Sequence, residues 1–434
     1  MEKFCGLSHL FMTVFLSCFS SFMVIPPMTD ITLSAICPGQ DECSLAIYLT
    51  GVSQVIVGLG SLVMMPVLGN LSDTYGRKFM LTVPMTLSIF PLAILAYSRT
   101  KYYFYAYYVL RTLIAMICEG SVQCLALAYV ADNVPESRRA SVFGVLSGIA
   151  SSAFVCGNLS ARFLSTASTF QVAAAMAVIA LIYMKMFLPE SIMKGGDICS
   201  KEAETTCLLE KASNKGFKFF KTLPSLSDML CLLKTSSTFL HAAIVSFLVN
   251  VATVGLENSL LYFLKAQFHF NKTQFADLLI ISGIAGSISQ LLLMPILAPA
   301  FGEEKLLSIG LFFSCLHMFL YSIAWSSWVP YATALISIVS IFAMPCLKSI
   351  ASRQIGPNKQ GKVQGCITGI CSFATVVCPI IFSPLTALFL SQNAPFHFPG
   401  FAIACSAFAS MIAFIQSLMI KPVSDVANSN LAEP

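Results

Sequence analysis

Twelve long apolar runs dominate this sequence of 434 residues. A helix needs about 20 mostly apolar residues to cross the hydrocarbon core of a bilayer. Backbone groups in lipid must be hydrogen-bonded within their own segment, so such runs form helices rather than open strands. The sequence therefore predicts an all-α membrane protein with twelve transmembrane helices. The expected spans are 8–28, 45–68, 79–98, 103–130, 141–164, 169–189, 238–264, 275–299, 305–325, 328–350, 363–391 and 398–420.

The composition excludes most classes of soluble protein. Hydrophobic residues make up 57% of the chain and charged residues only 10%, whereas soluble chains carry about 25% charged residues. We therefore expect no soluble enzyme, no nucleic-acid binder and no disordered scaffold. The sequence contains no nucleophile elbow, no Walker motif and no metal-ligand cluster. We accordingly expect no catalysis, no cofactor, no metal and no direct use of ATP.

Lys and Arg are unevenly distributed over the loops between the runs. Most of the 25 such residues fall in the loops after the even-numbered spans and near the chain ends. Cytoplasmic loops carry the excess of positive charge, so this distribution predicts that both termini are cytoplasmic. A plasma membrane and an endomembrane of the vacuole, lysosome or endosome both fit this topology.

One long polar segment separates six spans from six spans. The predicted organisation is an N-terminal bundle, a cytoplasmic linker, a C-terminal bundle and a cytoplasmic tail, over residues 1–189, 190–235, 236–420 and 421–434. In the linker, Lys215–Lys221 interleaves Lys with Phe, and this stretch either lies on an anionic leaflet or is a solvated linker. Glu204–Leu209 has the acidic-dileucine form that sorting adaptors bind, which makes such adaptors candidate partners.

The segments that follow the fourth and tenth spans resemble each other. Each holds a helix end, a Pro-containing turn, basic residues and a glycine near the start of the next span. Gly144 matches Gly365, and Gly148 matches Gly369 at the same separation along the chain. Any two cytoplasmic turns can look basic and glycine-rich, but the matched spacing favours two six-helix halves related by a parallel repeat, a layout found in transporters.

The loop between spans two and three reads Gly69-Asn-Leu-Ser-Asp-Thr-Tyr-Gly-Arg-Lys78. A tight reversal at the membrane face needs a permissive backbone, which Gly69 and Gly76 supply. Asp73 can accept hydrogen bonds from the N-terminus of an adjacent helix, where the dipole favours an anion. Arg77 can pair with Asp73 or with an acidic residue on a neighbouring helix. As an isolated loop this motif would be a generic charged turn, but its place after the second of twelve spans makes it a specific signal.

This loop resembles the signature of the major facilitator superfamily, Gly-x-Leu-Ser/Ala-Asp-x-x-Gly-Arg-Arg/Lys, at every defined position. The chain more closely resembles the tetracycline-efflux-like branch, in particular the hippocampus-abundant-transcript-like proteins, over nearly its whole length. That closer similarity rests on Ala128–Asp132, Leu188–Ser191 and Gln364–Gly369. The resemblance implies two pseudo-symmetric six-helix bundles and a secondary transporter of small solutes, many of which are driven by protons in that branch.

The resemblance also implies a gate. In the superfamily the Asp of this loop contacts the N-terminus of span eleven, and the Arg joins charges at the end of span four. Asp73 and Arg77 match these two positions, and Asp132, Arg138 and Arg139 are the candidates at the end of span four. A closed gate of this kind closes the cytoplasmic side and favours the outward-open state.

Two positions depart from the family's pattern. The corresponding loop of the second half has Pro299 where the Asp would fall, so we expect the second gate to be degenerate. Antiporters of the family carry a Gly-Pro pair in span five, where this chain has Gly157-Asn158, while Pro379 stands at the matched place in span eleven. Drug/proton antiport is therefore disfavoured, whereas uniport and symport stay open.

Ionisable residues inside the spans are functional candidates, because a charge in lipid is expensive. Arg111 and Glu119 in span four lie just over two helical turns apart, which projects them to similar faces. We expect them to pair with each other or with Gln54 or Asn158 from neighbouring spans. Glu119 is the first candidate for a protonatable group, and the alternative is a structural pair that ties span four to its neighbours.

Span seven holds the second candidate, Glu257, in its outer half together with Asn250. In the superfamily, spans one, four, seven and ten line the cavity, which makes both residues candidates for binding substrate or protons. Lys185 and Lys348 lie near cytoplasmic ends of spans, where long side chains extend toward the membrane surface.

Two features lie on the side opposite the cytoplasm. Cys37 and Cys43 stand outside the spans on an oxidising face, so a small-loop disulfide is expected there. Asn271 begins a glycosylation sequon close to the membrane.

The sequence thus predicts a monomeric twelve-helix facilitator that interacts with membrane lipids and a small-molecule substrate. It moves a small organic solute by alternating access, coupled to protons through Glu119 or Glu257. The alternative is a non-transporting receptor or sorting partner on the same scaffold, which would use residues 190–235 as its interaction surface and need no charged groups at the midplane.

Overall fold

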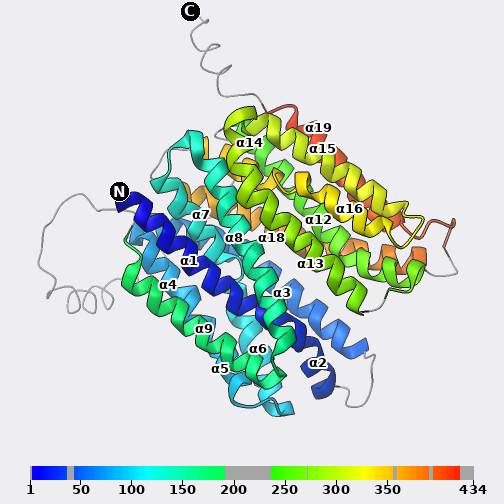
Figure 1. Ribbon diagram of the computed structural model, residues 1–434, viewed down its shortest axis with the longest axis horizontal. Coiled ribbons are helices and arrows are strands. Elements are labelled where there is room, and N and C mark those ends of the chain that lie inside the picture. Colours follow the sequence, from blue (N-terminus) through cyan, green and yellow to red (C-terminus); the bar gives the residue numbers. More distant parts are fainter. Residues whose placement is uncertain are drawn as a thin grey trace, which may run out of the picture.

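The chain is almost entirely helical (Figure 1). The computed structural model describes residues 2–36, 44–190, 236–270, 272–354, 359–390 and 394–420. Eleven helical stretches among these residues are long and apolar enough to cross a membrane, and Phe401–Ser417 is a shorter apolar helix. Together they match the twelve predicted spans, so the predicted fold class is confirmed.

The first six spans form one bundle, coloured blue to green in Figure 1. Several spans are interrupted and therefore consist of two helices. The elements are α1 (Glu2–Met23), α2 (Ile25–Ile36), α3 (Ser44–Tyr75), α4 (Arg77–Leu87), α5 (Ile89–Tyr97), α6 (Lys101–Cys118), α7 (Ser121–Asn133), the 3-10 turn η1 (Glu136–Arg138), α8 (Arg139–Phe163) and α9 (Thr166–Phe187).

The remaining spans form the second bundle, coloured green to red. A short π-helical turn, η3, interrupts span eight. The elements are α12 (Ser237–Phe268), α13 (Lys272–Ile288), η3 (Ser289–Leu293), α14 (Met294–Phe301), α15 (Glu303–Ser322), α16 (Val329–Ser340), α17 (Ala343–Arg353), α18 (Gln360–Leu390) and α19 (Phe401–Ser417).

Spans four and ten are broken at matched places. In span four the helix stops at Cys118, and Gly120 has a φ of 76°, a left-handed conformation that glycine adopts without steric cost. In span ten the helix stops at Ser340 and resumes at Ala343. Ser340 lies as far after Glu119 in the sequence as Gly365 lies after Gly144. The two halves therefore share the interruption as well as the glycines.

Span two packs closely against span eleven. Gly361, Gly365 and Gly369 are spaced by four residues and lie on one face of α18. A Cβ atom on Gly365 would lie 2.6 Å from the carbonyl oxygen of Met65, and one on Gly361 would overlap the carbonyl oxygen of Gly69. The backbones of α3 and α18 are thus in contact, as small residues permit between membrane helices.

The matched glycines of α8 lie in the equivalent contact between spans five and eight. A Cβ atom on Gly148 would lie 2.8 Å from Cγ of Leu291, and one on Gly144 would overlap the side chain of Met294. Here side chains rather than backbone occupy the space opposite the glycines. The second contact is therefore equivalent in place and less close than the contact between spans two and eleven.

The bundles meet at the end of the molecule that carries Gly69–Lys78, which we call the motif end. There α7 packs against α18, and α17 packs against α8. The principal contacts of α6 and α16, the other halves of spans four and ten, lie within their own bundles. The described helices therefore close the molecule at the motif end.

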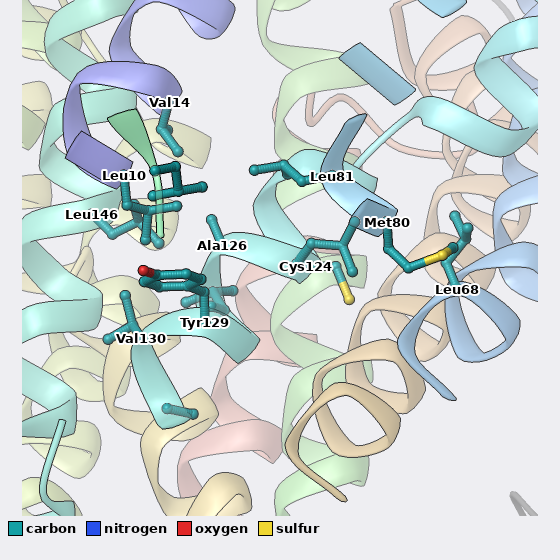
Figure 2. Close-up of a cluster of buried hydrophobic side chains, with 14 of the residues drawn as sticks. Leu10, Val14, Leu68, Met80, Leu81, Cys124, Ala126, Tyr129, Val130 and Leu146 are labelled. Carbon is teal, nitrogen blue, oxygen red and sulfur yellow. The ribbon is translucent and has the colours of Figure 1, made fainter. Parts of the chain in front are cut away.

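Buried apolar clusters hold each bundle together. Figure 2 shows the cluster of the first bundle near the motif end, where Leu10 of α1 and Leu146 of α8 approach α7. Every residue from Leu125 to Ala131 is at most 3% exposed, so α7 is covered on all sides, as expected for a helix that is apolar all round. This packing fixes the position of the charged residue that follows, Asp132.

The start of α1 and the end of α19 lie at the motif end. A Cβ atom on Gly6 would lie 3.0 Å from side-chain atoms of Pro189 and Tyr129. Ser417, the last residue of α19, lies with its hydroxyl oxygen 3.3 Å from that of Ser308. Several predicted features lie outside the described residues, namely the Cys37–Cys43 disulfide, the Asn271 sequon, the linker after residue 190 with its segments Glu204–Leu209 and Lys215–Lys221, and the tail 421–434.

Candidate functional site

Asp73 connects the two bundles at the motif end. Its carboxylate accepts hydrogen bonds from the backbone N–H groups of Gly361 and Lys362, both at 2.9 Å. These amides belong to the first turn of α18, where the helix dipole favours an anion. The closely packed glycines beneath them bring the end of α3 within reach of this turn. This is the place at which the family resemblance implied a contact of Asp73 with span eleven.

Arg77 forms ion pairs with two carboxylates of the first bundle, those of Asp73 and Asp132. Its side chain is only 1% exposed, and its Nε donates to Oδ2 of Asp132 at 2.8 Å. The guanidinium group also contacts the carboxylate of Asp73 and the hydroxyl of Ser72. Several hydrogen bonds on each charge are what a buried ion pair needs to offset its desolvation. Arg77 thereby ties the ends of spans two and four together.

Glu190, at the end of span six, completes this cluster and was not predicted. Its Oε1 accepts from the backbone N–H groups of Arg77 at 2.7 Å and Lys78 at 3.2 Å. It therefore binds the first turn of α4, which follows the reversal at Gly76, whose φ is 99°. Lys78 contributes its backbone N–H, and no ion pair of its side chain occurs in the described part of the chain. The sequence signal was the acidic residue in Leu188–Ser191.

Of the two basic candidates after span four, only Arg139 lies at the interface. It is 5% exposed, and its guanidinium donates to the hydroxyl of Ser352 at 3.2 Å and to the carbonyl of Ala131 at 2.9 Å. It thus links α8 to the end of span ten in the other bundle. Arg138 is exposed and forms no ion pair within the described ranges.

The second bundle has a buried ion pair that the sequence analysis did not predict. Nη2 of Arg353 lies 2.7 Å from Oε1 of Glu303, which is 3% exposed and also accepts from the hydroxyl of Ser349 at 3.0 Å. The same Nη2 donates to the carbonyl of Glu136 in the first bundle at 2.9 Å. Pro299 does lie where an Asp would fall, inside α14. The second bundle therefore has no Asp at that position, and Glu303 and Arg353 form a different charged pair there.

This pair repeats the pair of the first bundle with the charges exchanged. Glu303 follows Gly302 at the start of span nine, as Arg77 follows Gly76 at the start of span three. Arg353 lies as far after Asp132 as the matched glycines lie from each other. A search for the same residue types misses this pair, whereas a search for charged residues at matched positions finds it.

The two charged candidates of span four form no ion pair with each other among the described residues, although both lie within electrostatic range of Tyr107 of α6. Arg111 and Glu119 are both exposed. Because α6 stops at Cys118, helical spacing no longer determines how Glu119 projects. Asn158 donates to the carbonyl of Phe154 in its own helix at 2.8 Å. The expected pairing of these groups is therefore not observed, and Glu119 stands at the break of span four.

The candidates of span seven lie against span eleven. The amide nitrogen of Asn250 donates to the carbonyl of Ser246 and lies 2.9 Å from Sγ of Cys371. Glu257, two turns further along α12, is exposed and lies within electrostatic range of Cys378 on α18. Gln54 on α3 is also exposed, and its side chain forms no hydrogen bond among the described residues.

A shallow cavity of about 220 Å³ lies elsewhere, between α1, α8 and α13. Its lining is mostly apolar and consists of Phe22, Ala150, Ser151, Phe154 and Gly283. None of the candidate residues lines it, so we do not assign it to the predicted site. Within the described residues, no group of three or more His, Cys, Asp or Glu side chains is placed to hold a metal ion.

Comparison with known proteins agrees with this architecture. The family profile described as Major Facilitator Superfamily matches residues 10–379. The chain is 23% identical over 396 residues to hippocampus abundant transcript-like protein 1 of Homo sapiens, covering 88% of this chain and 71% of that protein. It is 23% identical to the class C tetracycline resistance protein of Escherichia coli, covering 78% of this chain and 80% of that protein.

A solved structure shares the fold over both bundles. The human organic anion transporter MFSD10 superposes with a TM-score of 0.75 at 19% identity, over 96% of this chain and 100% of that one. Members of the matched family are transporters rather than enzymes, and proton coupling and alternating access are typical of them. Because the profile matches most of its length, this multi-pass membrane protein belongs to the Major Facilitator Superfamily.

Proposed function

We propose that the protein transports a small organic solute by alternating access. The observation that carries this proposal is the link from Asp73 to the first turn of α18. It lies where the two bundles meet, whereas the other halves of spans four and ten pack within their own bundles. A structure closed at the motif end corresponds to one of the two states that a rocking-bundle transporter needs.

We further propose that transport is coupled to protons through Glu119 or Glu257. Broken helices near the midplane are typical of substrate and ion sites in transporters, and Glu119 stands at such a break. Arg111, Gln54, Asn158 and Asn250 are proposed to contact the solute or to position these two carboxyl groups.

The proposed topology has the motif end and both termini in the cytoplasm. The basic loops that favour it all follow even-numbered spans. The two bundles, 1–189 and 236–420, are proposed to be joined by a cytoplasmic linker, 190–235, with 421–434 as a tail. We propose a monomer, and sorting adaptors as partners of Glu204–Leu209.

Transport is tested by a metabolite screen on sealed vesicles. Vesicles with wild-type protein, vesicles with Asp73→Asn protein and protein-free vesicles receive the same extract, and their contents are compared by mass spectrometry. We expect at least one small organic solute to equilibrate or accumulate only with wild-type protein. If no solute enters above the protein-free level while the protein is folded and inserted, the receptor alternative is favoured instead.

Proton coupling is tested with the solute that the screen identifies. Glu119→Gln and Glu257→Gln are compared with Asp277→Asn, a control whose side chain is exposed near the start of α13. We expect one of the first two variants to lose the pH dependence of uptake and the control to keep it. Unchanged pH dependence in both would remove the assignment.

A further inference from the structure

Lys348 places an amino group in the interior, between the two bundles. It belongs to α17 in span ten and is partly buried. Its side chain lies within electrostatic range of Cys124 of α7 in the first bundle and of Cys371 of α18 in the second. Both neighbours belong to helices that meet near the motif end.

The lysine side chain extends away from the near membrane surface. Lys348 lies five residues before the end of α17, about 7.5 Å along the helix. Cys124 and Cys371 lie nine and eleven residues from the motif end of their helices, about 13 to 17 Å away. Helical side chains tilt toward the N-terminus, which in α17 is the membrane interior. The expectation that Lys348 extends to the surface was therefore wrong.

Lys348 has no resident counter-ion within the described part of the chain. The ion pairs of the motif end involve Arg77, Arg139 and Arg353 instead, and neither Glu119 nor Glu257 is among the charged groups near Lys348. A cation at membrane depth is costly unless it is paired. Two remedies exist, loss of the proton or a bound anion.

The described groups around the lysine carry no formal charge, and they include the amide of Gln364, whose Nε2 donates to the carbonyl of Lys348 at 3.4 Å. Besides the two thiols, the thioether of Met344 lies one turn before Lys348 and 3.9 Å from the amide nitrogen of Asn250. Such surroundings offer one strong electrostatic contact, and otherwise polarisable sulfur contacts and uncharged amides. They suit a ligand with one acidic group and an apolar body, and they disfavour a ligand with several charges.

We propose that Lys348 binds the acidic group of an amphipathic organic anion, such as an aryl carboxylate, held between spans four, ten and eleven. The proposal rests on the proposed transport function and names its substrate class. The anion supplies the counter-charge that the protein lacks, and Cys124 and Cys371 flank its binding place from the two bundles.

Equilibrium dialysis of purified protein with radiolabelled 1-naphthoate tests this. We expect saturable binding to wild-type protein, at least about tenfold weaker binding to Lys348→Met, and binding within about threefold of wild type to Lys348→Arg. Lys185→Met, which removes an exposed lysine of α9, is the matched control and should bind as wild type does. The cation 1-naphthylmethylamine has the same ring and should not compete.

Three binding results would overturn the assignment. One is the absence of saturable naphthoate binding to wild-type protein, and another is equal binding to wild type and Lys348→Met. Competition by the naphthyl cation would likewise favour a deprotonated lysine over an anion site.

A second measurement needs no variant, so misfolding of Lys348→Met cannot obscure the answer. Cys371 is partly buried beside Lys348, and its alkylation by a small maleimide can be followed by peptide mass spectrometry. We expect 1-naphthoate, and not the naphthyl cation, to slow alkylation of Cys371 in wild-type protein. An unaltered rate at saturating naphthoate contradicts the proposed location.

Both measurements are made at equilibrium in detergent and require no flux. If naphthoate binds through Lys348 but no solute moves in vesicles, the transport proposal fails and the anion site remains. If vesicles transport a solute while naphthoate binding does not depend on Lys348, the anion site fails and the transport proposal remains.

Discussion

At the scale of residues, the charged groups of the motif end form two kinds of contact. Ion pairs lie within a bundle, as between Arg77 and Asp132 or between Glu303 and Arg353. Contacts between bundles join a charged side chain to a backbone or hydroxyl group, as Asp73 does with α18. Opening the motif end then breaks hydrogen bonds without separating opposite charges, which keeps the energetic cost of opening small.

Neutralising Asp73 is expected to loosen this end. An Asn side chain offers one carbonyl oxygen and no charge to the first turn of α18, so a charge-assisted contact becomes a weaker one. In Asp73→Asn protein, hydrogen–deuterium exchange at the amides of Gly361 and Lys362 should accelerate at least about threefold, a change of about 0.65 kcal/mol. Asp277→Asn, which changes an exposed acid of α13 away from the motif end, serves as the control, and equal exchange in all three proteins would exclude a closing role for Asp73.

Removing Arg353 is expected to destabilise the second bundle strongly. Glu303 is 3% exposed, and a buried charge left without its partner typically costs about 3 to 5 kcal/mol. Arg353→Met should therefore lower the thermal midpoint in detergent clearly, and adding Glu303→Gln should restore part of the loss. An exposed acid such as Glu136 should matter by less than about 1 kcal/mol when replaced. Midpoints that coincide for Arg353→Met and wild type would show that the pair contributes little.

At the scale of helices, the close contact of α3 with α18 decides where the bundles can meet. Glycines at four-residue intervals remove the side chains that would hold the backbones apart. The equivalent contact of α8 has its glycines opposite side chains, Leu291 and Met294, which can adjust. We therefore infer that the α3–α18 contact tolerates less change than the α8 contact.

A methyl group on Gly361 is expected to prevent full closure. Its Cβ would overlap the carbonyl of Gly69 and the guanidinium of Arg77, so α18 must move away from α3. Gly361→Ala should increase hydrogen–deuterium exchange over residues 69–78. Gly286→Ala is the matched control in α13, because its Cβ would approach Ile341 only to 3.4 Å, and it should exchange as wild type does. The steric argument would be contradicted if exchange increased in Gly286→Ala, or if it did not increase in Gly361→Ala.

At the scale of the molecule, two bundles of matched architecture carry unmatched charges. The same number of residues separates the break of span four from that of span ten, and the glycines of span five from those of span eleven. The ion pairs coincide in place and are opposite in sign, and Lys348 has Leu127 as its counterpart. The helix breaks and glycines are thus the same in the two halves, whereas the charged residues at matched positions differ.

Cutting the linker is expected to leave the bundles together. The contacts of α3 with α18 and of α8 with α13 and α14 join the halves independently of residues 190–235. A protease site inserted in that segment should yield, after cleavage, two fragments that coelute from size-exclusion chromatography in mild detergent. Fragments that separate would mean that the linker, rather than the helix contacts, holds the two halves together.

Much of this architecture could be predicted because its cause acts locally along the chain. Lipid requires long apolar helical segments, so the apolar runs predicted twelve spans. The resemblance of the loop after span two to the family's signature implied the contact of Asp73 with span eleven. The pairing of Arg111 with Glu119 could not be predicted correctly, because it assumed an unbroken helix where Gly120 interrupts span four.

The sequence by itself determined that the helices lie in lipid, and it determined the fold class, the repeat and the motif. Each of these depends on neighbouring residues or on a constant spacing along the chain. Only the tertiary structure decided that Glu303 meets Arg353, that Glu190 binds the start of α4 and that Lys348 extends inward. These outcomes depend on which helix faces join after folding. A charge's partner lies far away along the chain, and its direction follows from packing that no short stretch of sequence specifies.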